Sequence, residues 1–103
     1  MIVRLVKMTF REDEVKNFQQ LFDRQKEKIG AFPGCKYLSL LHGKDDPRIF
    51  FTYSIWESTD DLETYRHSDL FKETWAQTKV LFDAKPEAWS TEMEYSVLPL
   101  FDV

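Results

Sequence analysis

Residues 49–61 read IFFTYSIWESTDD, and this stretch decides the fold. Its first part is rich in aromatic and β-branched residues and contains no Gly or Pro, which predicts a strand over 48–56. Because successive strand residues point to opposite faces, the odd positions place four large apolar side chains on one face. The even positions place Phe50 and Trp56 on the other face. Both faces of this strand therefore need cover.

A helix is predicted to begin directly after this strand. Ser58 or Thr59 can serve as its N-cap, and two Asp residues follow in the first turn, where the helix dipole favours carboxylates. The helical region extends over 59–82, and a break is expected near 67–69 because Ser68 can cap a second helix.

The remaining elements complete a βαββαβ order. They are a strand over 1–10, a helix over 12–30, a strand over 35–42 and a last strand over 91–99. The last strand is expected to carry Met93, Tyr95 and Val97 on one face. This order predicts an α+β, ferredoxin-like fold with a four-stranded antiparallel sheet. Right-handed crossovers place both helical regions on one face and the first and third strands at the centre.

Composition bounds the classes of function. The 103 residues suffice for one domain, 1–103, and the net charge of −4 argues against nucleic acid as a partner. No apolar run is long enough for a membrane span, and the first residues do not read as a secretory leader. The single cysteine, Cys35, cannot form an internal disulfide, which fits a cytoplasmic protein.

The uncovered sheet face predicts a partner. Helices on one side leave exposed either Phe50 and Trp56 or their odd-numbered neighbours. Several large aromatics in water exceed what monomers usually expose. A second copy packed sheet to sheet is the simplest cover, so we expect a homodimer.

Three motifs carry a resemblance to a known family. They are WES at 56–58, DLETYRHSDLF at 61–71 and FPGC at 32–35. The chain resembles the antibiotic-biosynthesis monooxygenase (ABM) domain of the dimeric α+β barrel superfamily. The resemblance implies a dimeric barrel and a small cofactor-independent monooxygenase that acts on an aromatic or quinol-like molecule.

Heme degradation, the activity of one branch of this family, is not expected because the residues typical of that branch are replaced here. Aligned on Trp56 and on 68–71, Tyr65 stands where that branch has Trp, and Trp75 stands where it has the His ligand. The position of its Asn falls at Lys7 or a neighbour. An indole nitrogen is only a donor and cannot replace the iron ligand. We expect no cofactor.

The candidate site residues each have an ordinary alternative. Trp56, Tyr65 and Trp75 are predicted to line a substrate-binding pocket, although aromatics at helical spacing also build cores. His67 is the candidate catalytic base, although it also fits an exposed helix junction. The spacing of His67 and His42 forms no metal site. A non-enzymatic dimer that binds a small ligand is the alternative function.

Overall fold

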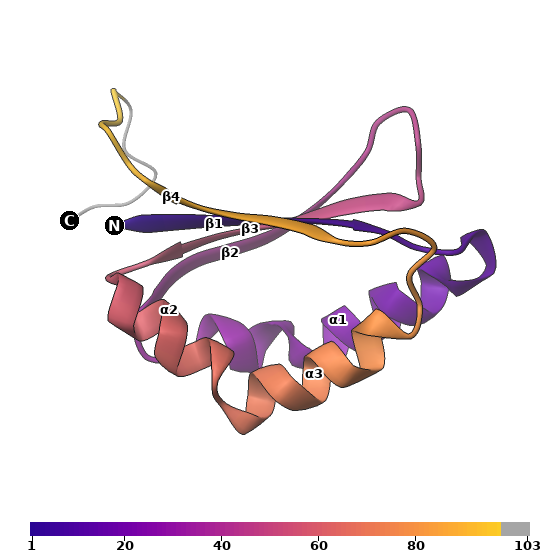
Figure 1. Ribbon diagram of the computed structural model, residues 1–103, viewed down its shortest axis with the longest axis horizontal. Coiled ribbons are helices and arrows are strands. Elements are labelled where there is room, and N and C mark those ends of the chain that lie inside the picture. Colours follow the sequence, from indigo (N-terminus) through magenta and orange to yellow (C-terminus); the bar gives the residue numbers. More distant parts are fainter. Residues whose placement is uncertain (98–103) are drawn as a thin grey trace.

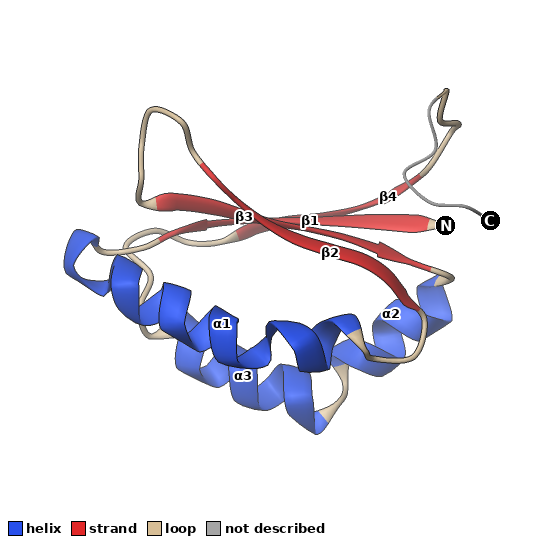
Figure 2. Ribbon diagram, turned by 180° about the vertical axis from the view of Figure 1, so that it is seen from behind, coloured by secondary structure: helices blue, strands red, loops and turns tan. Residues whose placement is uncertain are grey.

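The structure is a computed structural model that describes residues 1–97. Its elements in chain order are β1 (Ile2–Thr9), the 3-10 turn η1 (Glu12–Glu14), α1 (Val15–Gly30), β2 (Cys35–His42), β3 (Ile49–Trp56), α2 (Thr59–Arg66), α3 (Asp69–Lys79) and β4 (Glu87–Glu92). All strand pairs are antiparallel in the order β2-β3-β1-β4. The helices cover one face of the sheet, with β1 and β3 at its centre (Figure 1, Figure 2). The predicted ferredoxin-like fold is confirmed.

Two serines define the helical boundaries on the second half of the chain. Ser58 Oγ accepts a hydrogen bond from the Asp61 backbone N–H at 3.1 Å, which selects Ser58 over Thr59 as the cap of α2. Ser68 Oγ accepts from the Phe71 backbone N–H at 3.1 Å and starts α3. The expected break near 67–69 is therefore present because each cap satisfies an otherwise unpaired helix-start donor.

The turn between α1 and β2 depends on Gly34. Its φ of 89° lies in the left-handed region that glycine adopts without strain. A Cβ at this position would collide with the Asp61 side chain, so α2 packs directly over the glycine. The Gly34 carbonyl accepts from the Glu57 backbone N–H at 2.8 Å, which fixes the end of β3.

The last strand lies earlier in the chain than the sequence predicts. The expectation was 91–99, whereas β4 covers Glu87–Glu92. The reason is the length of its partner, because β4 runs antiparallel to β1 and Glu92 already pairs with Ile2 at the start of β1. The predicted row lies beyond the strand and is exposed: Met93, Tyr95 and Val97. Positions 98 and 99 lie outside the described residues.

The two faces of β3 have different surroundings. Phe50 is buried against Phe18 of α1, and Trp56 is buried with Leu62 of α2, so the even positions face the helices. The odd positions face away from the helices. Of the two alternatives left open by the sequence, the odd-numbered neighbours are therefore the set that the helices leave uncovered, and within it Ile49, Phe51 and Tyr53 keep partial exposure whereas Ile55 is buried.

The face of the sheet opposite the helices carries several large apolar side chains beside the Lys7–Glu87 pair. Leu41 of β2 pairs with Phe51, and Trp89 of β4 pairs with Leu5, so these four side chains share that face. Leu41 and Trp89 are 48% and 47% exposed. Residues 93–97 extend away from the helical layer on the same side (Figure 1). We call this surface, Leu5, Leu41, Phe51 and Trp89, the open face.

Candidate functional site

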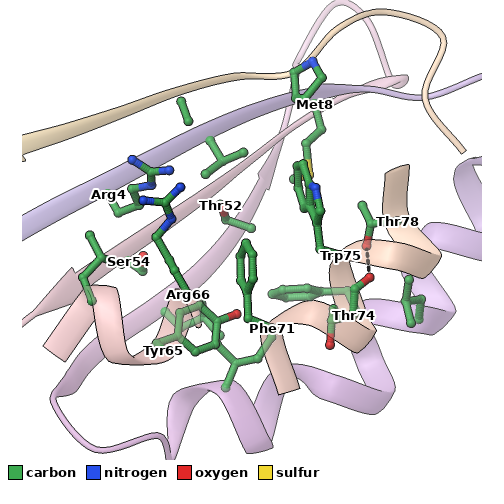
Figure 3. A pocket seen from close by; sticks show the side chains of 18 of the residues that line it. Arg4, Met8, Thr52, Ser54, Tyr65, Arg66, Phe71, Thr74, Trp75 and Thr78 are labelled. Carbon is green, nitrogen blue, oxygen red and sulfur yellow. Dashed lines mark hydrogen bonds between the residues drawn. The ribbon is translucent and has the colours of Figure 1, made fainter. Parts of the chain in front are cut away.

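A cavity of about 350 Å³ lies between the sheet and the helices. It falls in the lower part of the roughly 300–1,000 Å³ range of small-molecule sites. Its walls are mostly apolar and include six aromatic side chains: Phe18, Phe22, Trp56, Tyr65, Phe71 and Trp75. The polar lining is a small set of hydroxyl and guanidinium groups: Arg4, Thr52, Ser54, Tyr65, Arg66, Thr74 and Thr78. Figure 3 shows most of these side chains converging from the sheet and from the helices.

A run of contacting aromatic rings forms the helical wall. Tyr65 stacks on Trp56 with ring centroids 4.9 Å apart, and its edge contacts Phe71 at 5.3 Å. Phe71 in turn stacks on Trp75 at 6.0 Å with an interplanar angle of 8°. The wall thus consists of two stacked pairs that meet nearly at a right angle, with 79° between Tyr65 and Phe71. Such a wall offers a planar aromatic ligand both face and edge contacts, and aromatic pairs of either kind add about 0.5–1.5 kcal/mol beyond burial.

Trp56 supports this wall from behind. Its indole N–H donates to Ser54 Oγ at 3.0 Å, and no part of the side chain is exposed. A ligand in the cavity can therefore contact Tyr65 and Trp75, which keep accessible surface, more readily than Trp56. Trp56 positions the Tyr65 ring.

Tyr65 provides a protonated hydroxyl. Burial, with a smaller contribution from nearby Cys35, raises the pKa of the phenol well above its usual range. The group therefore stays neutral at physiological pH and can donate a hydrogen bond. Within residues 1–97 its hydroxyl has no hydrogen-bond partner. A ligand oxygen is the natural acceptor for this proton.

Thr74 supplies a second hydroxyl on α3. Gln25, buried on α1, donates from Nε2 to Thr74 Oγ1 at 3.0 Å. Thr78 Oγ1 donates to the Thr74 backbone carbonyl at 2.7 Å (Figure 3). Because Gln25 occupies an acceptor site of the Thr74 hydroxyl, the proton of that hydroxyl is available to a ligand.

Two arginines reach the same cavity. Arg4 of β1 donates from Nη1 to Ser90 Oγ at 2.9 Å, and Arg66 at the end of α2 donates from Nη1 to Glu63 Oε1 at 2.9 Å. Partial burial and then the positive charge of Arg66 lower the pKa of Arg4, whereas Glu63 raises it. The Nε–H of Arg66 is enclosed by protein without an acceptor among the described residues. A buried donor left unpaired costs about 1–3 kcal/mol, and more when it is charged.

The structure brings together three of the four predicted site residues. Trp56, Tyr65 and Trp75 lie in the cavity wall, whereas His67 does not. The His67 side chain is 75% exposed, and its Nδ1 lies 2.8 Å from the Glu63 backbone carbonyl. Its position therefore does not support a role as the base of this cavity, and the predicted base and binding residues are not in one site. His42, at the end of β2, is exposed as well.

The sequence interpretation missed the polar lining of the cavity. Arg4 carried a usable signal, because an Arg at an even position of β1 lies on the same face as Val6 and Met8. Arg66 and Thr74 carried none, because a helix-surface Arg or Thr is ordinary in a sequence without its tertiary contacts.

Other kinds of site find no support in the described part of the chain. No three His, Cys, Asp or Glu residues between 1 and 97 lie close enough to hold a metal ion. None of the helices described is both long and apolar enough to cross a bilayer. Burial raises the pKa of the Cys35 thiol, so this half-buried group stays protonated and is a weak nucleophile.

Solved structures share this architecture. A conserved protein from Methanosarcina mazei matches with a TM-score of 0.85 and 21% identity, covering 91% of this chain and 94% of that chain. Rv0793 from Mycobacterium tuberculosis matches with a TM-score of 0.86 and 16% identity over 94% and 98%. SnoaB, a cofactor-independent oxygenase from Streptomyces nogalater, matches with a TM-score of 0.83 and 14% identity over 93% and 95%. These likenesses show the fold.

Sequence comparison identifies the family. No curated protein matches the chain at a significant level. The family model described as antibiotic biosynthesis monooxygenase matches residues 1–77, which include β1 through most of α3 and nearly all of the cavity lining. The chain therefore belongs to the antibiotic biosynthesis monooxygenase (ABM) family.

Proposed function

We propose that this protein is a small cofactor-independent monooxygenase that acts on an aromatic, quinol-like molecule in the cavity between sheet and helices. The observation that carries the proposal is the cavity wall of stacked aromatic pairs with a few converging hydroxyl groups. Membership of the ABM family supports the reaction class, and the fold shared with a cofactor-independent oxygenase is consistent with it.

In this reaction the substrate supplies the electrons. A substrate that has lost one CH₂ proton to solvent before it binds passes an electron from the carbanion to O₂. The resulting radicals join as a peroxide anion, which takes one proton back from solvent, and loss of water then leaves a carbonyl. The balance is one CH₂ group and one O₂ giving one C=O and one H₂O. The protein excludes bulk water, and Tyr65 and Thr74 donate hydrogen bonds to the charge that develops on the substrate oxygen.

Oxygen consumption tests this function directly. The protein is incubated with a panel of quinols and anthrones, and the rate of O₂ loss is compared with buffer and with heat-denatured protein. We expect one or more compounds to be oxidised with one O₂ consumed per product carbonyl. Rates equal to buffer across the panel would contradict the proposal.

A non-enzymatic ligand-binding role is the second candidate, and one observation favours it. No His, Asp, Glu, Lys or Cys lines the cavity among the described residues, so no side chain there titrates near neutrality. A substrate acidic enough to lose its proton to water needs no such base, whereas a less acidic compound would only bind. Thermal stabilisation by aromatic compounds without any O₂ consumption would favour this alternative.

Heme degradation finds no support in the lining residues. Neither His42 nor His67 lies in the cavity, and the indole of Trp75 cannot ligate iron. A Soret band that appears on heme titration and is lost when either histidine is replaced would reverse this conclusion.

We also propose that the protein is a homodimer that packs through the open face. Leu41 and Trp89 are about half exposed there, and the adjacent Tyr95 and Val97 are both 77% exposed. Burial of one large apolar side chain contributes roughly 1.5–3 kcal/mol. A partner copy that buries several of these side chains would therefore stabilise the dimer. Sedimentation equilibrium at micromolar concentration should give twice the chain mass, and a monomer mass would refute the proposal.

A further inference from the structure

We infer that the ligand of this cavity is a small planar aromatic compound that carries an anionic oxygen group, bound by the guanidinium groups of Arg4 and Arg66. The inference rests on the proposed function in that it specifies the ligand of the same cavity. The observation that supports it is a pair of guanidinium groups on the wall of a largely apolar cavity.

The two guanidinium groups come from different layers of the fold. Arg4 occupies a position of β1 that faces the helices, and Arg66 is the last residue of α2. Figure 3 shows both groups near Ser54 and Tyr65, with Trp75 at the opposite end of the cavity. A ligand that stacks along the aromatic wall can therefore place a substituent between the two arginines.

One end of each guanidinium is already anchored. Arg4 Nη1 is bound to Ser90 Oγ, and Arg66 Nη1 is bound to Glu63 Oε1, each at 2.9 Å. These bonds hold the two side chains in place before a ligand arrives. Preorganised donors lose less conformational entropy when an anion binds.

The local charge is not balanced. Arg4 and Arg66 carry two positive charges, and Glu63 is the carboxylate that acts on both. His67 lies 3.9 Å from Glu63 and adds positive charge if it is protonated. Like charges that face one another at a partly buried site are unfavourable unless an anion lies between them. One negative charge on the ligand would neutralise the cluster.

The free donors of the two arginines favour a particular anion. Nη1 of Arg66 is bound to Glu63 and its Nε is enclosed by protein, so Nη2 is the donor left to a ligand. Nη1 of Arg4 is bound to Ser90, which leaves its other N–H groups. A carboxylate can give one oxygen to each guanidinium, whereas a phenolate offers a single oxygen, so the carboxylate is the expected form of the group.

Calorimetric titration with three ligands of similar shape tests the inference. They are 2-naphthoate, its neutral isostere 2-naphthamide, and 2,4-dinitro-1-naphtholate, which is ionised at pH 7.5. Because charge-assisted hydrogen bonds are stronger than neutral ones, 2-naphthoate should bind about tenfold more tightly than 2-naphthamide. Arg66→Gln should abolish that preference and change the 2-naphthamide affinity by less than about twofold. Arg24→Gln, an exposed change on α1, is the matched control and should leave both affinities unchanged.

Each outcome decides the inference. An arginine-dependent preference for 2-naphthoate supports a carboxylate ligand, and the same preference for the naphtholate alone supports a phenolate. Equal binding of acid and amide, a preference that survives both Arg66→Gln and Arg4→Gln, or no binding at all overturns it. If Arg66→Gln fails to fold by circular dichroism, Arg4→Gln takes its place.

The inference and the proposed function fail separately. Arginine-dependent binding of 2-naphthoate without O₂ consumption by any aromatic substrate would refute the monooxygenase proposal and support the anion site. Oxidation of neutral quinols at a rate unaffected by Arg4→Gln and Arg66→Gln would support the monooxygenase proposal and refute the anion site.

Discussion

Replacement of Tyr65 by Phe separates the chemical role of this residue from its packing role. The ring contacts Trp56 at 4.9 Å, Phe32 at 5.3 Å and Phe71 at 5.3 Å, and Phe keeps all three contacts. The hydroxyl has no partner within residues 1–97, so its removal takes away no hydrogen bond to that part of the chain. We therefore expect the free energy of unfolding to stay equal or rise by up to about 1 kcal/mol.

The effect on turnover should be opposite. Loss of one preorganised donor to a developing oxyanion lowers kcat by about 10²-fold, or roughly 2.7 kcal/mol of transition-state stabilisation. The assay is O₂ consumption with the best compound of the quinol and anthrone panel, with urea unfolding measured on the same preparations. Tyr53→Phe is the matched control, because Tyr53 lies on the opposite side of the sheet from the cavity. Unchanged turnover in Tyr65→Phe would refute the reasoning.

Alkaline titration provides an independent check on the same hydroxyl. Because burial raises the folded-state pKa of Tyr65, the unfolded chain loses this proton first as the pH rises. The stability that Tyr65 contributes is therefore fully present below about pH 10 and is lost above it, by up to about 1.4 kcal/mol per pH unit. Tyr65→Phe should show a shallower alkaline decline than the parent protein, and identical slopes would contradict the burial argument.

Three further substitutions test the architecture. Ser58→Ala should reduce the free energy of unfolding by about 1 kcal/mol through loss of the α2 cap. The exposed control Thr59→Ala should change it by less than about 0.5 kcal/mol. Equal effects of the two changes in urea unfolding would mean that Ser58 is not the cap. Gly34→Ala should destabilise by about 2 kcal/mol because φ is 89° and Asp61 fills the space, whereas Gly30→Ala, with open space around it, should be neutral or stabilising. Trp89→Glu should weaken dimerisation at least about tenfold in sedimentation equilibrium with little change in helix content, and an unaltered dimer would remove the open face as the interface.

The strand β3 shows why the fold could be predicted from the sequence. Its aromatic and β-branched residues, the absence of Gly and Pro and the immediate Ser cap are local signals, and all point to the same boundary. The order of elements then restricts the topology, because right-handed crossovers leave one arrangement of the sheet. The central position of β1 and β3 follows from that rule alone and requires no knowledge of individual side-chain contacts.

The position of β4 could not be predicted for an equally physical reason. Residues 87–92 read EAWSTE, a poor strand by propensity, and they form one because β1 offers them a free edge. The apolar alternation at Met93, Tyr95 and Val97 looks like a better strand, but β1 begins at Ile2, and the backbone hydrogen bond from Met93 N–H to the Met1 carbonyl already reaches the first residue of the chain. Pairing partners outweigh local propensity at the edge of a sheet.

The site was predictable in part. Tyr65 and Trp75 could be placed on a helical wall from their aromatic character, but the base could not. His67 follows Tyr65 by two positions, which turns it about 200° around the helix axis and carries it to the surface. The arginine pair depends on a strand and a helix end that meet only in the folded chain, so the sequence carried no direct sign of their proximity.

The most direct test of the account is the response of the three tryptophan indole N–H signals to ligand in a ¹H–¹⁵N correlation spectrum. Trp75 lines the cavity, Trp56 supports its wall and Trp89 lies on the open face, so each reports on a different place. We predict that 2-naphthoate or an active quinol shifts the Trp75 signal strongly, the Trp56 signal weakly and the Trp89 signal not at all. A shift confined to Trp89, or no shift at saturating ligand, would contradict the cavity as the functional site.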